Sequence, residues 1–195
     1  FKSYVFYNAR YKRGHFFLLL KVISVQWIES FCDKFAKYIG VIISFLLILM
    51  MINVAFDALN RYIMNSNSVA LQEMEWHLFS VIILLGLSYS LSEEGHVRVD
   101  ILYTGFSEKK KAIVNMTGVI LFILPLSLLI AYGSINFVEK SFIFMEQSGD
   151  PGGLPFRFII KGLIPTSFVI LIVMSIGYFA RNYNLLKKLN SSSDS

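Results

Sequence analysis

The sequence predicts an all-α integral membrane protein with four transmembrane helices plus an N-terminal amphipathic interfacial helix, and with both termini cytoplasmic. The composition is the first reason. Of the 195 residues, 55% are hydrophobic and 16% are charged, whereas an average soluble domain has about 25% charged residues. The second reason is that four charge-free segments approach the roughly 20 residues that a helix needs to cross a bilayer. The third is an uneven distribution of Lys and Arg along the chain.

The first two charge-free segments are residues 38–56 and 76–92. In the first, Asn53 is the only strongly polar side chain. The second is shorter and contains His77 and several serines, so it is the most polar of the four segments. Both predict membrane spans, because neither contains a Lys, Arg, Asp or Glu side chain.

The other two charge-free segments are residues 112–138 and 162–180. The former is long enough to tilt in the bilayer or to continue beyond it. Pro125 lies within this segment and predicts a kink, because proline removes one helical hydrogen bond. Pro165 falls in the opening turn of the last segment, where proline is tolerated.

The distribution of positive charge predicts how the spans are oriented. Of the 18 Lys and Arg residues, 14 lie before the first span, between the second and third spans, or after the fourth. By the positive-inside rule these segments face the cytoplasm, so both termini are cytoplasmic. The net charge of +5 then reflects membrane orientation, and no nucleic-acid partner is predicted.

The N-terminal segment has the pattern of a helix that lies on the membrane surface. Its apolar side chains recur at helical spacing: Leu20, Ile23, Trp27, Phe31 and Phe35. Lys21 interrupts the apolar run, which argues against a signal peptide or a fifth span. A disordered basic arm is the alternative. We therefore expect a basic arm and interfacial helix over residues 1–35, a transmembrane domain over 36–186 and a disordered polar tail over 187–195.

A turn is predicted at residues 148–155, where the sequence is Ser-Gly-Asp-Pro-Gly-Gly-Leu-Pro. Proline fixes its own backbone angle, and glycine reaches conformations that are closed to other residues. Apolar residues spaced three or four apart precede this turn between Ile135 and Met145. The helix of the third span is therefore expected to continue beyond the bilayer or to turn along its outer surface.

The polar residues give little support to catalysis or to independent transport. His96 and Asp100 are four residues apart, but the second span separates them from the acids that precede it, so no metal-ligand set is complete. Within the spans, His77 is the only ionisable side chain, and it lies near one end. Ion pathways usually carry such groups deep in the membrane. We therefore expect no enzyme activity, no metal and no cofactor.

Small and amide side chains within the spans suit close packing of helices against one another. The residues alone thus predict a four-helix membrane protein that works by contact with other proteins.

Several short motifs occur in a characteristic order between Phe35 and Leu186. They are Asn60-Arg61-Tyr62, Leu71-Gln72-Glu73, Glu75-Trp76-His77-Leu78-Phe79, Gly95-His96-Val97-Arg98-Val99-Asp100, and Glu146 followed by Pro151-Gly152-Gly153-Leu154-Pro155. With these motifs the chain resembles the DctQ-like small membrane subunit of tripartite ATP-independent periplasmic (TRAP) transporters.

The resemblance implies a subunit of a secondary transporter in the bacterial inner (plasma) membrane, powered by an ion gradient, usually sodium. In such systems a periplasmic solute-binding protein captures an organic acid or similar solute, and a large TRAP membrane subunit moves it by an elevator-like motion. The small subunit is then a non-transporting brace that helps to dock the binding protein. Its partners are the large subunit, the binding protein and membrane lipids.

The resemblance also suggests which residues form the partner interface. On the outer side they are Arg61, Glu73, Glu75, Glu146, Pro151, Gly152 and Gly153, and on the inner side His96, Arg98 and Asp100. Two alternatives remain open. One is a free-standing membrane scaffold or assembly factor without a TRAP partner, and the other is a membrane enzyme that uses His96 and Asp100.

Overall fold

A computed structural model describes the backbone of residues 2–93 and 105–191 and the side chains of residues 27–93 and 105–191. These residues form helices joined by short connections, and no β-strand occurs in the described ranges. Four helical segments are long and apolar enough to cross a membrane. The predicted all-α fold with four transmembrane helices is therefore confirmed.

The longest helix is α1, Lys2–Met64, which includes the first predicted span. It is uninterrupted, so the segment predicted as an interfacial helix and the first predicted span form one continuous helix from Lys2 onward. The helical backbone also argues against the alternative of a disordered arm. The helix continues because no glycine or proline occurs between His15 and Ile39 to end it. The helix stops where Asn65 adopts a left-handed conformation with φ of 51°, a common way to end a helix.

The second and fourth predicted spans lie in α2, Val69–Ser92, and α7, Arg157–Ser191. Helix α7 extends through Ser191, so the prediction of a disordered tail from residue 187 was wrong for residues 187–191. Leu and Lys dominate this stretch, and both favour the helical conformation. Residues 192–195 of the predicted tail lie outside the described residues.

The third predicted span is a series of four helical pieces. They are α4, Glu108–Gly118; η1, Val119–Ile123; α5, Leu124–Gly133; and α6, Ile135–Ile143. In η1, a π-helical turn, the Leu124 amide donates to the Val119 carbonyl five residues earlier. The turn lies immediately before Pro125, where the sequence predicted a kink, and such irregular turns are found where proline interrupts the helical hydrogen bonds. The helix also continues past residue 138, as predicted.

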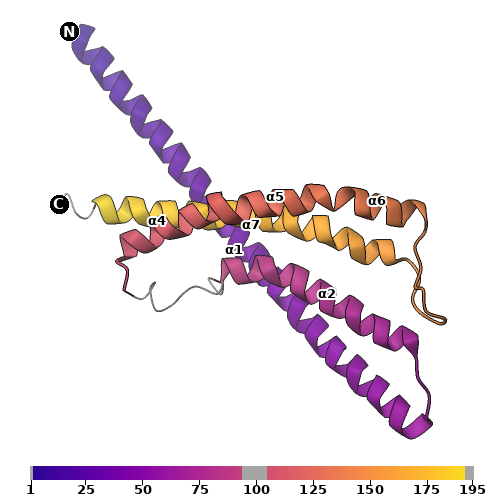
Figure 1. The fold of residues 1–195 in the computed structure, drawn as a ribbon. Coiled ribbons are helices and arrows are strands. Elements are labelled where there is room, and N and C mark those ends of the chain that lie inside the picture. Colours follow the sequence, from indigo (N-terminus) through magenta and orange to yellow (C-terminus); the bar gives the residue numbers. More distant parts are fainter. Residues whose placement is uncertain (1, 94–104, 192–195) are drawn as a thin grey trace.

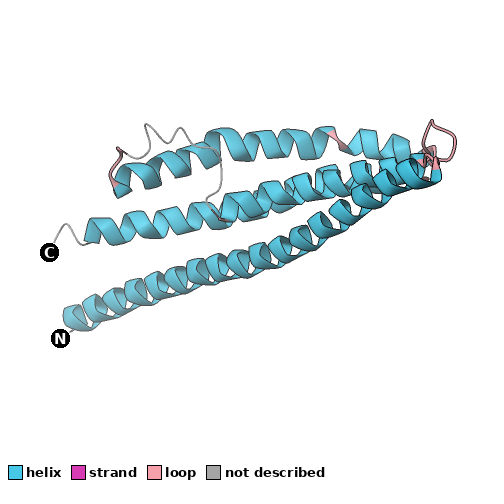
Figure 2. Cartoon of the chain, turned by 90° about the horizontal axis from the view of Figure 1, so that it is seen from below, coloured by secondary structure: helices cyan, strands magenta, loops and turns pink. Residues whose placement is uncertain are grey.

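Helix α7 is the central element, because it contacts every other helix of the described ranges. Helices α5 and α6 lie along one side of it, and α2 lies between α7 and α1 (Figures 1 and 2). The α1–α2 turn and the α6–α7 connection lie at one end of the molecule, here named the loop end (Figure 1). The ends of α2 and α7 and the start of α4 lie toward the other, here named the terminal end. Toward the loop end, α2 and α7 diverge (Figure 1).

The buried core lies where α1, α2 and α7 cross, toward the terminal end. Cys32 and Ala36 of α1 pack there with Leu91 of α2 and Met174 of α7. Gly177 permits this close approach, because a Cβ at that position would lie 2.5 Å from the Cys32 Sγ and 2.8 Å from the Cys32 Cβ. Small residues that let helix backbones approach closely are typical of membrane helix contacts.

Candidate functional site

A polar network at the loop end is centred on Glu73 of α2. Its carboxylate accepts hydrogen bonds from the Ser148 hydroxyl, from the Leu154 backbone amide at 2.6 Å and from the Arg157 Nη2 at 2.6 Å. The Glu73 side chain is only 11% exposed, and a charge so far removed from water needs this number of partners. Glu73 therefore joins α2 to the start of α7 and to the loop that precedes it.

The loop that Glu73 holds, residues 144–156, is also closed by its own backbone. The Ser148 amide donates to the Leu154 carbonyl at 3.2 Å, and the Gly153 amide donates to the Asp150 carbonyl at 3.0 Å. Gly152 has φ of 83°, which L side chains rarely adopt. The predicted turn is therefore confirmed, and it has a defined shape.

Gly153 is required for a different reason, which is lack of space. A Cβ at this position would collide with the Ser148 side chain and lie 2.8 Å from the Glu73 Oε2. Positive φ also occurs on either side of the turn, at 43° for Met145 and 63° for Phe156. Both residues have a Cβ, which disfavours this backbone conformation. Such backbone conformations persist only where surrounding contacts hold them. Here the Met145 amide donates to the Phe142 carbonyl, and the Phe156 carbonyl accepts from the Ile159 amide, each at 3.0 Å.

A second ion pair supports the base of the same loop. Lys161 of α7 pairs with Glu146, and its Nζ also lies 4.1 Å from the centre of the Phe137 ring of α6. The Lys161 ammonium holds the pKa of the Glu146 carboxyl below its ordinary value of 4.5. The Arg157 amide donates to the Glu146 carbonyl at 3.0 Å. Both ends of the loop are thus fixed to the first two turns of α7.

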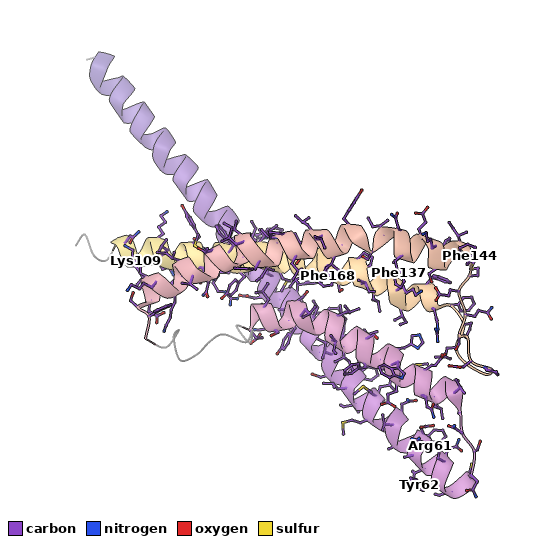
Figure 3. All side chains as sticks on the ribbon, in the orientation of Figure 1. Arg61, Tyr62, Lys109, Phe137, Phe144 and Phe168 are labelled. Atoms are coloured by element: carbon purple, nitrogen blue, oxygen red, sulfur yellow. The ribbon has the colours of Figure 1, made fainter. Side chains whose placement is uncertain are left out.

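The structure separates the other predicted outer residues from this network. Arg61 lies at the tip of α1, on the opposite arm from Phe144 at the end of α6 (Figure 3), and pairs at 2.9 Å with the buried Asp57 one turn earlier. Glu75 is half-buried on α2. It follows Glu73 by two residues, so it projects from a different side of the helix. Of the acids predicted for the outer interface, only Glu73 and Glu146 meet the loop.

The predicted inner interface, His96, Arg98 and Asp100, lies outside the described residues. The structure therefore gives no geometry for it. Within residues 27–93 and 105–191, no group of three or more His, Cys, Asp or Glu side chains is arranged to hold a metal ion.

A further network, which sequence reasoning missed, lies at the terminal end. Arg181 of α7 pairs with Asp33 of α1, has its Nε 3.7 Å from the Glu29 carboxylate, and donates from Nη1 to the Ser92 carbonyl at 3.2 Å. Asn184 donates to Glu29 at 3.4 Å. One guanidinium thus joins α1, the end of α2 and α7. The sequence did contain a clue to this network. Glu29 and Asp33 precede the first predicted span and Arg181 follows the fourth, so all three were predicted on the same side of the membrane.

Arg157 and Ser148 were also missed as network residues. Arg157 entered the sequence argument only as one of the few basic residues on the outer side, and Ser148 only as part of the turn. Their pairing with Glu73 spans 84 and 75 positions of the chain. No local pattern marks a contact over such a separation, although the predicted topology already placed all three residues on the same side.

Comparison with known proteins identifies the family. Residues 50–184 match the family model described as tripartite ATP-independent periplasmic transporters, DctQ component. No curated protein matches the chain. The matched region extends from the last quarter of α1 to near the end of α7 and includes both the Glu73 and Arg181 positions. DctQ proteins are the small subunits of TRAP transporters and are not enzymes. The chain is thus a multi-pass membrane protein that belongs to the DctQ family of tripartite ATP-independent periplasmic transporters.

Proposed function

We propose that this chain is a stationary brace for the large TRAP membrane subunit and that its loop end helps to dock the periplasmic solute-binding protein. The complex would use an ion gradient to take up an organic acid or a similar solute. In this role the small subunit provides surfaces for its partners and has no transport route of its own.

The observation that carries the proposal is the fixed position of the 144–156 loop. Glu73 alone receives hydrogen bonds from Ser148, Leu154 and Arg157, so the turn at Pro151 and Gly152 projects from a rigid base. Both turn residues are exposed. A docking surface that is already ordered loses less conformational entropy when its partner binds. This supports an interface role for Glu73, Glu146 and the turn.

The brace role is supported by the large apolar surface of α1. In its most apolar window only 6% of the residues are buried within the chain, compared with 22% for α7. Val41, Phe45, Ile48 and Ile52 recur along one side of α1, with exposed fractions of 69%, 64%, 58% and 60%. Such a stripe is available to lipid or to another membrane subunit. We propose that part of it contacts the scaffold of the large subunit.

We propose that the loop end faces the periplasm and the termini face the cytoplasm of a bacterial inner membrane. The positive-inside distribution supports this orientation. His96, Arg98 and Asp100 would then contact the inner membrane surface or the large subunit, and Arg61 and Glu75 would contribute to the outer interface.

Reconstitution of the purified components tests the proposal. The chain alone in vesicles is expected to give no solute uptake. Together with the large subunit, the binding protein and an ion gradient, it should restore uptake that the other components cannot sustain without it. Uptake by this chain alone, or full uptake in its absence, would contradict the brace role.

A further inference from the structure

A pocket of about 380 Å³ opens between α2 and α7 at the loop end. Helix α2 forms one wall between Val69 and Ser80, helix α7 forms the other between Arg157 and Lys161, and Asp150 of the loop borders it. The pocket lies in the wedge that results from the divergence of these two helices (Figure 1). It borders the Glu73 network but is not filled by it.

The pocket straddles the level at which the helices enter the membrane. The charge-free segments begin at Trp76 in α2 and at Gly162 in α7, so Glu73, Asp150 and Arg157 lie on the aqueous side of that level. Trp76 lines the pocket and is 70% exposed. Tryptophan is enriched at the depth of lipid headgroups, where its ring contacts apolar chains and its N–H can donate a hydrogen bond.

The charges around the pocket favour a particular kind of headgroup. Arg157 and Lys161 line it, but each already pairs with a carboxylate, Glu73 and Glu146 respectively. Asp150 is exposed, and its carboxylate forms no ion pair with any residue in the described part of the chain. The pocket thus combines cations already balanced by acids with one unbalanced carboxylate. A net anionic headgroup would meet this carboxylate unfavourably, whereas a zwitterion can place its ammonium beside it.

A pocket at the opposite end of the molecule has a different balance of charge. It lies beside Glu29 and is lined by the cations Arg181, Lys187 and Lys188. The lining of the loop-end pocket carries two acids, Glu73 and Asp150, and two cations, Arg157 and Lys161, so it lacks the excess of cations found at the terminal end.

We propose that the loop-end pocket binds the headgroup of a zwitterionic phospholipid that carries a primary ammonium, phosphatidylethanolamine. The ammonium lies beside Asp150, the phosphate lies toward Arg157, Lys161 and the Trp76 N–H, and the acyl chains continue into the bilayer along the wedge. A primary ammonium has three N–H donors for a carboxylate, whereas the trimethylated ammonium of phosphatidylcholine has none. The site therefore discriminates by hydrogen bonding as well as by net charge.

Lipid titration of the full chain, followed by native mass spectrometry in detergent, tests this assignment. The probes are short-chain phosphatidylethanolamine, phosphatidylcholine and phosphatidylglycerol. The wild-type chain should bind phosphatidylethanolamine most tightly. Asp150→Lys should weaken that binding relative to phosphatidylglycerol by about fivefold or more, because the nearest free charge changes sign. Glu139→Lys is the matched control, because it makes the same charge change on an exposed acid of α6 that does not line the pocket, and it should keep the wild-type preference.

Asp150→Asn provides a second variant with less effect on the fold. The Asp150 backbone makes the hydrogen bonds of the turn, so the amide should preserve the loop while reducing the preference for phosphatidylethanolamine over phosphatidylcholine. Equal affinity of the wild-type chain for the three lipids would overturn the assignment. So would a preference that neither Asp150 variant changes, or one that Glu139→Lys changes as much as Asp150→Lys.

Discussion

The two ends of α7 are held to their neighbours by networks of opposite construction. At the terminal end one cation, Arg181, binds two acids of α1 and the last carbonyl of α2. At the loop end one acid, Glu73, binds a cation of α7, Arg157, and accepts hydrogen bonds from two groups of the 144–156 loop, the Ser148 hydroxyl and the Leu154 amide. The first network joins helices that are already in close contact. The second joins helices that diverge (Figure 1).

This difference indicates how one small helical subunit can combine rigidity with a surface for partners. The terminal end has a buried core and a glycine contact between α1 and α7, so its polar network adds to packing that already exists. At the loop end the Glu73 hydrogen bonds join α2 to the loop, and a pocket remains open beside them. We therefore expect substitutions at the terminal end to lower stability and substitutions at the loop end to lower function.

Gly177→Ala is expected to have the largest effect on stability. The added Cβ would meet the Cys32 Sγ at 2.5 Å, and overpacking of this kind typically costs about 1–3 kcal/mol. Thermal unfolding of the purified chain in detergent measures the loss. Gly86→Ala is the matched control, because it adds the same methyl group within α2 with nothing in 4 Å of it. Equal melting temperatures for the two variants would show that the terminal end is not closely packed.

Arg181→Ala should have the next largest effect on stability. It leaves Asp33 and Glu29 without their shared guanidinium, and for a side chain that is 32% exposed we expect a loss of about 1–2 kcal/mol. Denaturant or thermal unfolding measures the change, with Lys187→Ala as the exposed control on the same helix. Adding Asp33→Ala to Arg181→Ala should cost less than Asp33→Ala alone. Strict additivity of the two changes would argue that the pair contributes nothing.

The Glu146–Lys161 pair should have the smallest effect, and that effect should depend on pH. Because the pKa of Glu146 is lowered in the folded chain, the pair stabilises the fold above the ordinary pKa of 4.5 and loses this contribution as the pH falls through the lowered value. The melting temperature of Glu146→Gln should therefore lie below that of the wild type at about pH 7, and the difference should shrink toward about pH 3. A difference that grows on acidification would contradict the assigned pair.

The sequence was sufficient for the spans because each one depends on a local pattern. Charge-free runs identified four helices, Pro125 marked the irregular turn in the third, and the Pro-Gly cluster marked the loop. No break in the helix separates the N-terminal arm from the first span, because a change from an amphipathic to a fully apolar pattern does not end a helix. Only a residue that disrupts the backbone conformation does so, and none is present there.

The site was only half predictable, because its members are distant in the chain. Glu73 and Glu146 were identified through the family resemblance, while their partners Arg157 and Lys161 were counted only among the four basic residues outside the predicted cytoplasmic segments. To predict these ion pairs, one must know the direction in which each side chain projects from its helix as well as the side of the membrane on which it lies. The same limit applies to Arg181 and Asp33, whose contact joins the first and last spans.

The most direct test of the docking role compares Glu73→Gln with Glu139→Gln in the assembled transporter. Glu73→Gln keeps the size of the side chain but removes the charge that holds Arg157 and the loop, whereas Glu139 is exposed on α6 and makes no ion pair in the described part of the chain. The measurement is the rate of solute uptake by reconstituted vesicles as the concentration of binding protein is raised.

Both variants are expected to co-purify with the large subunit. Glu73→Gln should need about fivefold more binding protein than the wild type to reach half-maximal uptake, because a less ordered loop weakens docking. Glu139→Gln should follow the wild-type curve. Superimposable curves for the wild type and Glu73→Gln, with the complex intact, would contradict the claim that the Glu73 network prepares the loop for docking.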